Sequence, residues 1–167
     1  MELKEIDSAG IADNVFDLIG DAWMLITAGD REAFNMMTAS WGGMGVIWGK
    51  KVCFCVVRPG RNTYRFMESS DSFTLSFYDE RYRKALMYCG SHSGRDVDKV
   101  KESGLTPVFG EKGVYFAESR LVLCLRKLYF HDIDPTHFLD RAIDATHYPS
   151  KDYHRMYIGE ITACMMK

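Results

Sequence analysis

Residues 35–64 contain the side chains of this chain that are best suited to binding a ligand. Small hydroxyls and glycines leave backbone N–H groups accessible, arginines offer planar donors to phosphate or carboxylate, and tryptophans supply flat apolar surface. All of these surround one apolar segment, residues 52–57. Together they predict a ligand with one anionic end and one flat aromatic end. The residues concerned are Asn35, Thr38, Ser40, Asn62 and Thr63, with Trp41, Trp48, Arg58 and Arg61.

Arg58 and Arg61 lie three positions apart, at the end of the apolar segment. Two guanidiniums held this close repel each other unless an anion or an acidic side chain lies between them. A short helix is expected over 64–69, and Thr63 would cap its first turn and leave N–H groups pointing outward. We therefore expect this turn to bind an anionic group.

A second glycine- and serine-rich segment, CGSHSGRDVDK, covers residues 89–99. In one interpretation it is a loop between two helices, with Ser93 or Asp96 as the N-cap of the second. In the other it is a further wall of the same pocket, with Lys99 reaching inward from the helix. The sequence alone leaves both interpretations open.

The glycines near Lys50 do not form a known nucleotide-binding motif. Gly43 and Gly49 are separated by five residues instead of four, and Lys51 stands where a P-loop requires Ser or Thr. A dinucleotide-binding fingerprint fails as well, because Trp48 stands where its third glycine belongs. Neither a nucleoside triphosphate nor a Rossmann-type site is expected.

The cysteines and the remaining acidic residues do not predict a metal centre. Cys89 and His92 have the spacing of a ligand pair, but the chain has no second pair and no HExxH motif. The five cysteines are odd in number and mostly lie in apolar segments, which is typical of reduced, buried thiols. No metal, disulfide or nucleophilic cysteine is expected.

Length and composition predict one domain over residues 1–167. Hydrophobic residues make up 47% of the chain, and the formal net charge is -2. A nucleic-acid surface would need an excess of basic residues. The apolar runs are far shorter than the roughly 18 residues that a membrane helix needs. The first ten residues, MELKEIDSAG, have no export signal. We expect no nucleic acid, no membrane and a cytoplasmic location.

The elements that must position these side chains are expected to be short strands and helices. Apolar spacing predicts helices over 8–20, 80–89, 96–103 and 136–146, with Gly20, Gly90 and Gly104 at the ends of the first three. Strands are expected over 23–28, 33–40, 52–58, 72–78, 114–118, 120–130 and 153–166. Residues 41–49 are glycine-rich and should break the strand pattern. The fold class is mainly β with some α, as an antiparallel, closed or half-open barrel.

Five segments, taken in order, resemble the flavin reductase-like family, whose fold is the FMN-binding split β-barrel with short peripheral helices. They resemble in particular its short bacterial members, which include flavoredoxin-like electron carriers. The segments span most of the chain and are NMMTASW at 35–41, VRPGRNTY at 57–64, FTLSF at 73–77, CGSxSGRDxDK at 89–99 and DYHRxYxGE at 152–160.

The resemblance implies a homodimer with one non-covalent FMN per subunit, held near the subunit interface. Arg58, Arg61 and Thr63 would hold the phosphate or the ribityl chain, and His154 would face either the flavin or the partner subunit. Ser93, Gly94 and Lys99 would approach from the other side. The isoalloxazine ring would lie against residues 35–41, which contribute Asn35, Met36, Met37, Thr38, Ser40 and Trp41.

Flavin chemistry fits this layout and needs no catalytic acid or base, because hydride passes from nicotinamide to the stacked flavin ring. A lysine such as Lys99 near N1 and the C2 carbonyl would favour reduction. Three functions stay open. NAD(P)H could reduce the flavin directly; the protein could instead carry electrons between redox proteins without NAD(P)H turnover; or the barrel could bind an aromatic anion other than flavin.

Overall fold

The computed structural model describes residues 2–167 and consists mainly of antiparallel sheet. Seven strands follow the order β3-β2-β6-β9-β10-β5-β4, and β1 (Lys4–Ile6) pairs with β10. Within the described residues β3 and β4 form the two ends of this sheet and do not pair with each other. The bounds are β2 (Met24–Gly29), β3 (Phe34–Ala39), β4 (Gly42–Ile47), β5 (Lys50–Val57), β6 (Ser72–Phe77), β9 (Leu121–Asp132) and β10 (Arg155–Met166).

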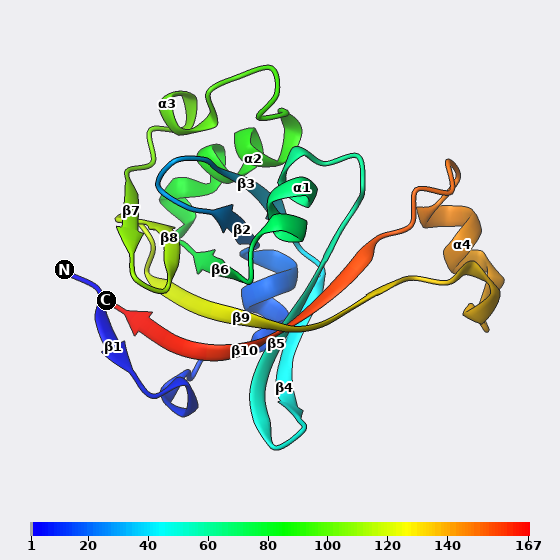
Figure 1. Ribbon diagram of the computed structural model, residues 1–167, viewed down its shortest axis with the longest axis horizontal. Coiled ribbons are helices and arrows are strands. Elements are labelled where there is room, and N and C mark those ends of the chain that lie inside the picture. Colours follow the sequence, from blue (N-terminus) through cyan, green and yellow to red (C-terminus); the bar gives the residue numbers. More distant parts are fainter. Residues whose placement is uncertain (1) are drawn as a thin grey trace.

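The helices are short and cover the molecule unevenly (Figure 1). Three of them, α1 (Asn62–Ser69), α2 (Arg83–Ser91) and α3 (Lys99–Ser103), gather on one side of the sheet, next to the two-stranded ribbon of β7 (Pro107–Gly110) and β8 (Gly113–Phe116). The fourth, α4 (Arg141–His147), lies on an arm that projects between the ends of β9 and β10. Within residues 2–167, no helix is both long and apolar enough to cross a membrane.

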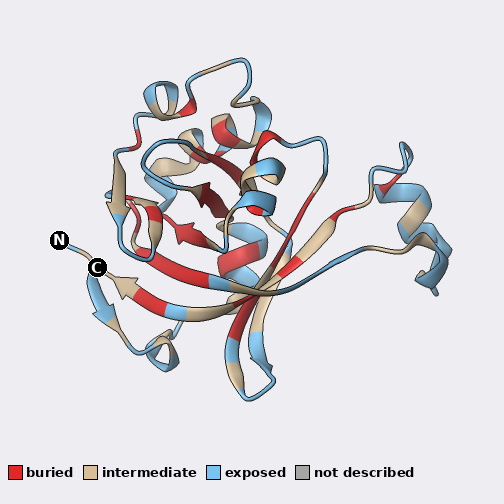
Figure 2. Cartoon of the chain, viewed as in Figure 1, coloured by how far each residue is buried: buried red, intermediate tan, exposed pale blue. Residues whose placement is uncertain are grey.

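The core lies where the long strands cross the middle of the sheet (Figure 2). The segment Leu121–Leu125 is buried at every position, so both faces of β9 are covered there. Apolar residues of β2, β5, β6 and β9 pack together on one side, and α2 packs against a second cluster around Leu25 and Met36. A strand that is covered on both faces has apolar residues at successive positions. For this reason these strands can be predicted from the sequence.

The sequence predicts most strands correctly, including the buried strand over 52–58, which the structure places at Lys50–Val57. The prediction for residues 41–49 is wrong, because Gly42–Ile47 forms β4 and pairs with β5 through a tight turn at Trp48 and Gly49. The glycines have a packing reason. A Cβ at Gly43 would lie 2.5 Å from the ring of Phe54 on the paired strand, so glycine makes room for that ring.

The predicted helix over 8–20 is also wrong. Residues 8–10 form a 3-10 turn capped by Asp7, and a π-helical turn spans Asp17–Asp21, so Gly20 lies inside a turn and ends nothing. Leu18 and Ile19 are nevertheless buried. Both buried residues belong to the second turn, so only the later part of the predicted helix is helical.

Three helix ends differ from their predictions, two of them because the residue concerned has a distant partner. Thr63 lies within α1 instead of capping it, and its hydroxyl accepts a hydrogen bond from Asn35. Gly90 lies inside α2, where its Cα faces Thr38. Asp98, not Ser93 or Asp96, caps α3, while Gly104 ends that helix as predicted, at φ 70°. The fourth helix begins only at Arg141, after a 3-10 turn.

Gly159 in the middle of β10 offers a stability test. A Cβ there would lie 2.8 Å from Cβ of Leu125 and 3.0 Å from the ring of Phe73. We expect Gly159→Ala to lower the free energy of unfolding by about 1–3 kcal/mol, because the packed core must shift. Urea denaturation measures this. The control Gly45→Ala meets no atom within 4 Å and should change stability by less than about 0.5 kcal/mol; equal effects would contradict the packing argument.

Candidate functional site

The site is organised around the free edge of β3. The Nζ atom of Lys99 donates to the carbonyl of Met36 at 2.9 Å, on the side of β3 that faces away from β2. Backbone groups of alternate residues in an antiparallel strand point to the same edge. The N–H and C=O groups of Thr38 therefore face outward as well, although its hydroxyl donates to the carbonyl of Leu86 at 2.6 Å. This edge offers main-chain donors and acceptors to a ligand.

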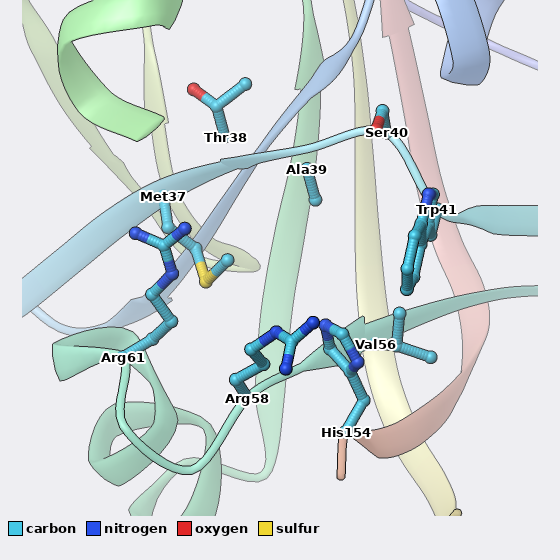
Figure 3. A pocket seen from close by; sticks show the side chains of 9 residues that line it. All are labelled: Met37, Thr38, Ala39, Ser40, Trp41, Val56, Arg58, Arg61 and His154. Carbon is cyan, nitrogen blue, oxygen red and sulfur yellow. The ribbon is translucent and has the colours of Figure 1, made fainter. Parts of the chain in front are cut away.

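A pocket of about 190 Å³ lies beside this edge, and we call it the Trp41 pocket (Figure 3). Residues 37–41 form one wall, and the end of β5 with the start of β10 forms the other, so the pocket occupies the opening between the two halves of the sheet. Its side chains combine one large aromatic surface with two guanidiniums. The opposite wall consists of Val56, Arg58, Arg61 and His154.

A cluster of aromatic side chains around Trp41 closes the outer end of the Trp41 pocket. The ring centroid of Trp41 lies 5.1 Å from that of His147 and 5.2 Å from that of His154. Nδ1 of His154 is 2.8 Å from the hydroxyl of Tyr148, and the histidine is buried. Burial, together with the nearby charge of Arg58, lowers the pKa of His154 to about 4. The imidazole is therefore neutral at pH 7.

Arg58 has an acidic partner within the chain. Its Nη1 atom lies 2.6 Å from Oδ1 of Asp152, and its Nη2 atom donates to the carbonyl of His147 at 2.8 Å. The acid that the paired arginines were expected to require is therefore supplied, for Arg58, by the arm that carries α4. Among the described residues Arg61 forms no ion pair, so its charge is the one available to a ligand.

A second pocket, of about 390 Å³, adjoins the first, and we call it the Arg95 pocket. Met37 and Arg61 line both pockets, so the two pockets border on each other at these residues. One wall is the turn of residues 60–63, and the other is the loop of residues 91–96. The cations around it are Arg61, Arg95 and Lys99, against one acid, Asp96.

Lys99 is a buried cation that joins three elements. Besides Met36, its Nζ atom donates to the carbonyl of Cys89 at 2.8 Å. Burial lowers the pKa of Lys99 to about 8, and the charge of Arg61 acts in the same direction. The ammonium is still protonated at pH 7, and two carbonyls use two of its three N–H donors. One donor remains for the Arg95 pocket.

The Arg95 pocket has the donors that a phosphate group requires. No side chain caps the first turn of α1, which begins in its wall, so the N–H groups of Asn62 and Thr63 stay available, while that of Tyr64 donates to the carbonyl of Arg61. The buried Oδ1 atom of Asn62 has no hydrogen-bond partner among the described residues. Gly94 is required by close approach, since a Cβ there would lie 2.1 Å from Oδ1 of Asn35. The residues present therefore fit an anionic, hydroxylated group.

The structure brings together most residues that the sequence singles out, but in two groups. Residues 37–41 with Arg58 and His154 line the Trp41 pocket; Arg61 lines both pockets; Thr63, Ser93 and Lys99 line the Arg95 pocket. Asn35, Met36 and Gly94 line a separate hollow behind β3. Trp48 lies at the tip of the β4–β5 turn, near Tyr129, and does not line either pocket.

Sequence reasoning missed Arg95, Val56 and Tyr148 as site residues. Arg95 lies inside a segment that carried the family resemblance, so its position was a signal that could have been used. Val56 and Tyr148 had none, because an apolar strand residue and a tyrosine on an arm are ordinary until the chain folds.

The low pKa of His154 makes stability depend on pH. Between pH 6.5 and about 4, the unfolded chain binds a proton at this histidine that the folded chain does not, so the stability that the neutral ring contributes is lost as the pH falls through this window. We expect His154→Gln to reduce that loss by about 1–3 kcal/mol. Urea titrations at pH 7 and pH 4.5 measure it. The control His137→Gln replaces an exposed histidine and should lose as much stability between pH 7 and pH 4.5 as the wild type. An equal loss in all three proteins would contradict the assignment.

Comparison with known proteins identifies the family and the fold of the chain. The sequence profile described as the flavin reductase like domain matches residues 17–167. No curated protein sequence matches the chain significantly.

Solved structures with the same fold are distant in sequence. An FMN-binding domain of a flavin reductase-like enzyme from Shewanella baltica has a TM-score of 0.70 at 16% identity, covering 99% of this chain and 78% of that one. Flavoredoxin of Desulfovibrio vulgaris has 0.68 at 24% identity, with coverage of 97% and 77%. An NADH:FAD oxidoreductase of Streptomyces globisporus has 0.66 at 16% identity, with coverage of 87% and 75%.

These similarities confirm the predicted fold, an antiparallel split β-barrel with short peripheral helices. The profile match covers most of the chain, from the π-helical turn to the last strand. The chain therefore belongs to the flavin reductase-like domain family.

Proposed function

We propose that this protein is a flavin-dependent redox protein that binds FMN non-covalently. One observation carries the proposal. A pocket with an aromatic wall and free main-chain groups borders, at Met37 and Arg61, on a pocket that is lined by three cations. FMN has the matching shape, a flat heteroaromatic ring joined by a polyol to a phosphate. Family membership and FMN-binding structural neighbours support it.

In this proposal the ring binds in the Trp41 pocket. The free edge of β3 would hydrogen-bond the polar edge of the ring, and Trp41 would cover its outer end. The flavin, when bound, supplies hydride or single-electron transfer. The chain binds the ring, orients it and shields it from water, and the neutral His154 adds no charge beside it. No residue needs to act as catalytic acid or base.

The phosphate would bind in the Arg95 pocket. Arg61, the free donor of Lys99 and the first-turn N–H groups of α1 all face this pocket. Hydrogen bonds from charged donors to phosphate are the stronger kind, and each guanidinium has five N–H donors. In this arrangement Lys99 stands closer to the phosphate than to N1 of the ring. Thr63 acts indirectly, through its bond to Asn35.

We further propose a homodimer with the flavin near the subunit interface. The arm that carries α4 projects from the rest of the molecule (Figure 1) and leaves Leu139 fully exposed and Ile143 42% exposed. Trp41, at the mouth of its pocket, is 42% exposed. Large exposed apolar side chains in one region mark a contact surface. A partner subunit on this side would cover the arm and the outer end of the flavin pocket.

Two functions remain for such a protein, an NAD(P)H-dependent flavin reductase and an electron carrier of the flavoredoxin type. The purified holoprotein, mixed anaerobically with NADH or NADPH, separates them. Bleaching of the flavin absorbance within a catalytic turnover time supports the reductase. A flavin that stays oxidised with both nucleotides but is reduced by dithionite supports the carrier. A colourless preparation that binds no added FMN overturns both and leaves an aromatic anion other than flavin as the ligand.

Arg61 provides a test of the phosphate position. We expect Arg61→Ala to weaken FMN about 10- to 100-fold, because a charge-assisted hydrogen bond is lost. Riboflavin, which has no phosphate, should lose much less affinity. Quenching of flavin fluorescence measures both dissociation constants. The control Arg65→Ala removes an exposed arginine of α1, the helix that begins directly after Arg61, and this arginine lines neither pocket. Equal losses of affinity for FMN and riboflavin in Arg61→Ala would place the phosphate elsewhere.

A further inference from the structure

Two arginines cross the Arg95 pocket in opposite directions. Arg61, on the turn after β5, donates from Nη1 to the carbonyl of Gly90 at 2.8 Å. Arg95, on the loop after α2, donates from Nη1 to the carbonyl of Gly60 at 3.1 Å. Each side chain starts on one wall and ends on the backbone of the other. We call this pair the arginine straps.

The two straps stand at different places along the path of a ligand. Arg61 lines both pockets and therefore lies at the border between them, whereas Arg95 lines only the Arg95 pocket. A ligand whose ring lies in the Trp41 pocket would pass Arg61 first and meet Arg95 beyond it. The hydrogen bond from Arg95 to Gly60 thus bridges the two walls on the side away from the Trp41 pocket, which we call the far end.

The charges favour a terminal phosphate at that place. A phosphate monoester carries about 1.5 to 2 negative charges at pH 7 and has three free acceptor oxygens. A phosphate inside a diphosphate has one charge and two such oxygens. The pocket provides Arg61, Arg95 and one donor of Lys99 around a single space. The three cationic groups match the three free oxygens of the monoester in number, and they favour its larger negative charge.

From this arrangement we infer that the arginine straps select FMN against FAD, with Arg95 as the specificity-determining residue. The inference rests on the proposed function, because it presumes a flavin ring in the Trp41 pocket. FAD continues beyond its first phosphate with a second phosphate and an adenosine. That extension has to break the contact between Arg95 and Gly60 to leave the pocket, whereas FMN ends inside it.

The test compares three flavins, riboflavin, FMN and FAD, by fluorescence titration of the apoprotein. The wild type should bind FMN at least about tenfold more tightly than FAD, the difference expected when one strong contact must be broken. Arg95→Ala opens the far end, so the ratio of the FAD and FMN dissociation constants should fall at least about fivefold. Arg65→Ala, which removes an exposed arginine away from the pockets, should keep the wild-type ratio.

The outcomes separate the inference from the function on which it rests. Equal affinity of the wild type for FMN and FAD overturns the selection by Arg95 and leaves flavin binding intact. An unchanged ratio in Arg95→Ala, with both phosphorylated flavins weakened relative to riboflavin, overturns it too, because Arg95 is then only a phosphate ligand. Failure of the wild type to bind any of the three flavins overturns the proposed function itself.

Discussion

The free edge of β3 is the constraint on which the rest of the site depends. Main-chain groups on a sheet edge that is covered by other elements must find partners, since unpaired buried polar groups are costly. The ammonium of Lys99 donates hydrogen bonds to two carbonyls, that of Met36 on this edge and that of Cys89 near the end of α2. The same contacts fix α2 and α3 against the strand. The following part of the edge, at Thr38, lines the Trp41 pocket.

Burying Lys99 in this role brings a cation to the site with little freedom to move. Its pKa falls because the charged form loses water, yet at about 8 it is still protonated at pH 7. The arginines are held in the same way by backbone carbonyls, Arg61 by Gly90 and Arg95 by Gly60. A site whose donors are already ordered loses less entropy when an anion binds. Structure and electrostatics thus depend on the same few hydrogen bonds.

The sequence was most informative about buried strands and least informative where polar residues or glycines have distant partners. The run Leu121–Leu125 predicts a strand because both of its faces are covered. Thr63 is predicted to cap a helix, but its hydroxyl accepts a hydrogen bond from Asn35, 28 positions away. Gly90 is predicted to end a helix, but a glycine stands there because Thr38 packs closely against it. Local rules fail at these positions because a long-range contact replaces the local one.

By itself, the sequence predicted the family and the class of fold, because five segments in fixed order resemble the flavin reductase-like family. It also identified Arg61 and Trp41 as site residues, and both line the pockets. Only the tertiary structure decided which arginine has a free charge, since Asp152, 94 positions from Arg58, neutralises that one. It likewise decided that Arg95 hydrogen-bonds to Gly60 across a pocket, because the turn and the loop that this residue joins are neighbours only after the chain has folded.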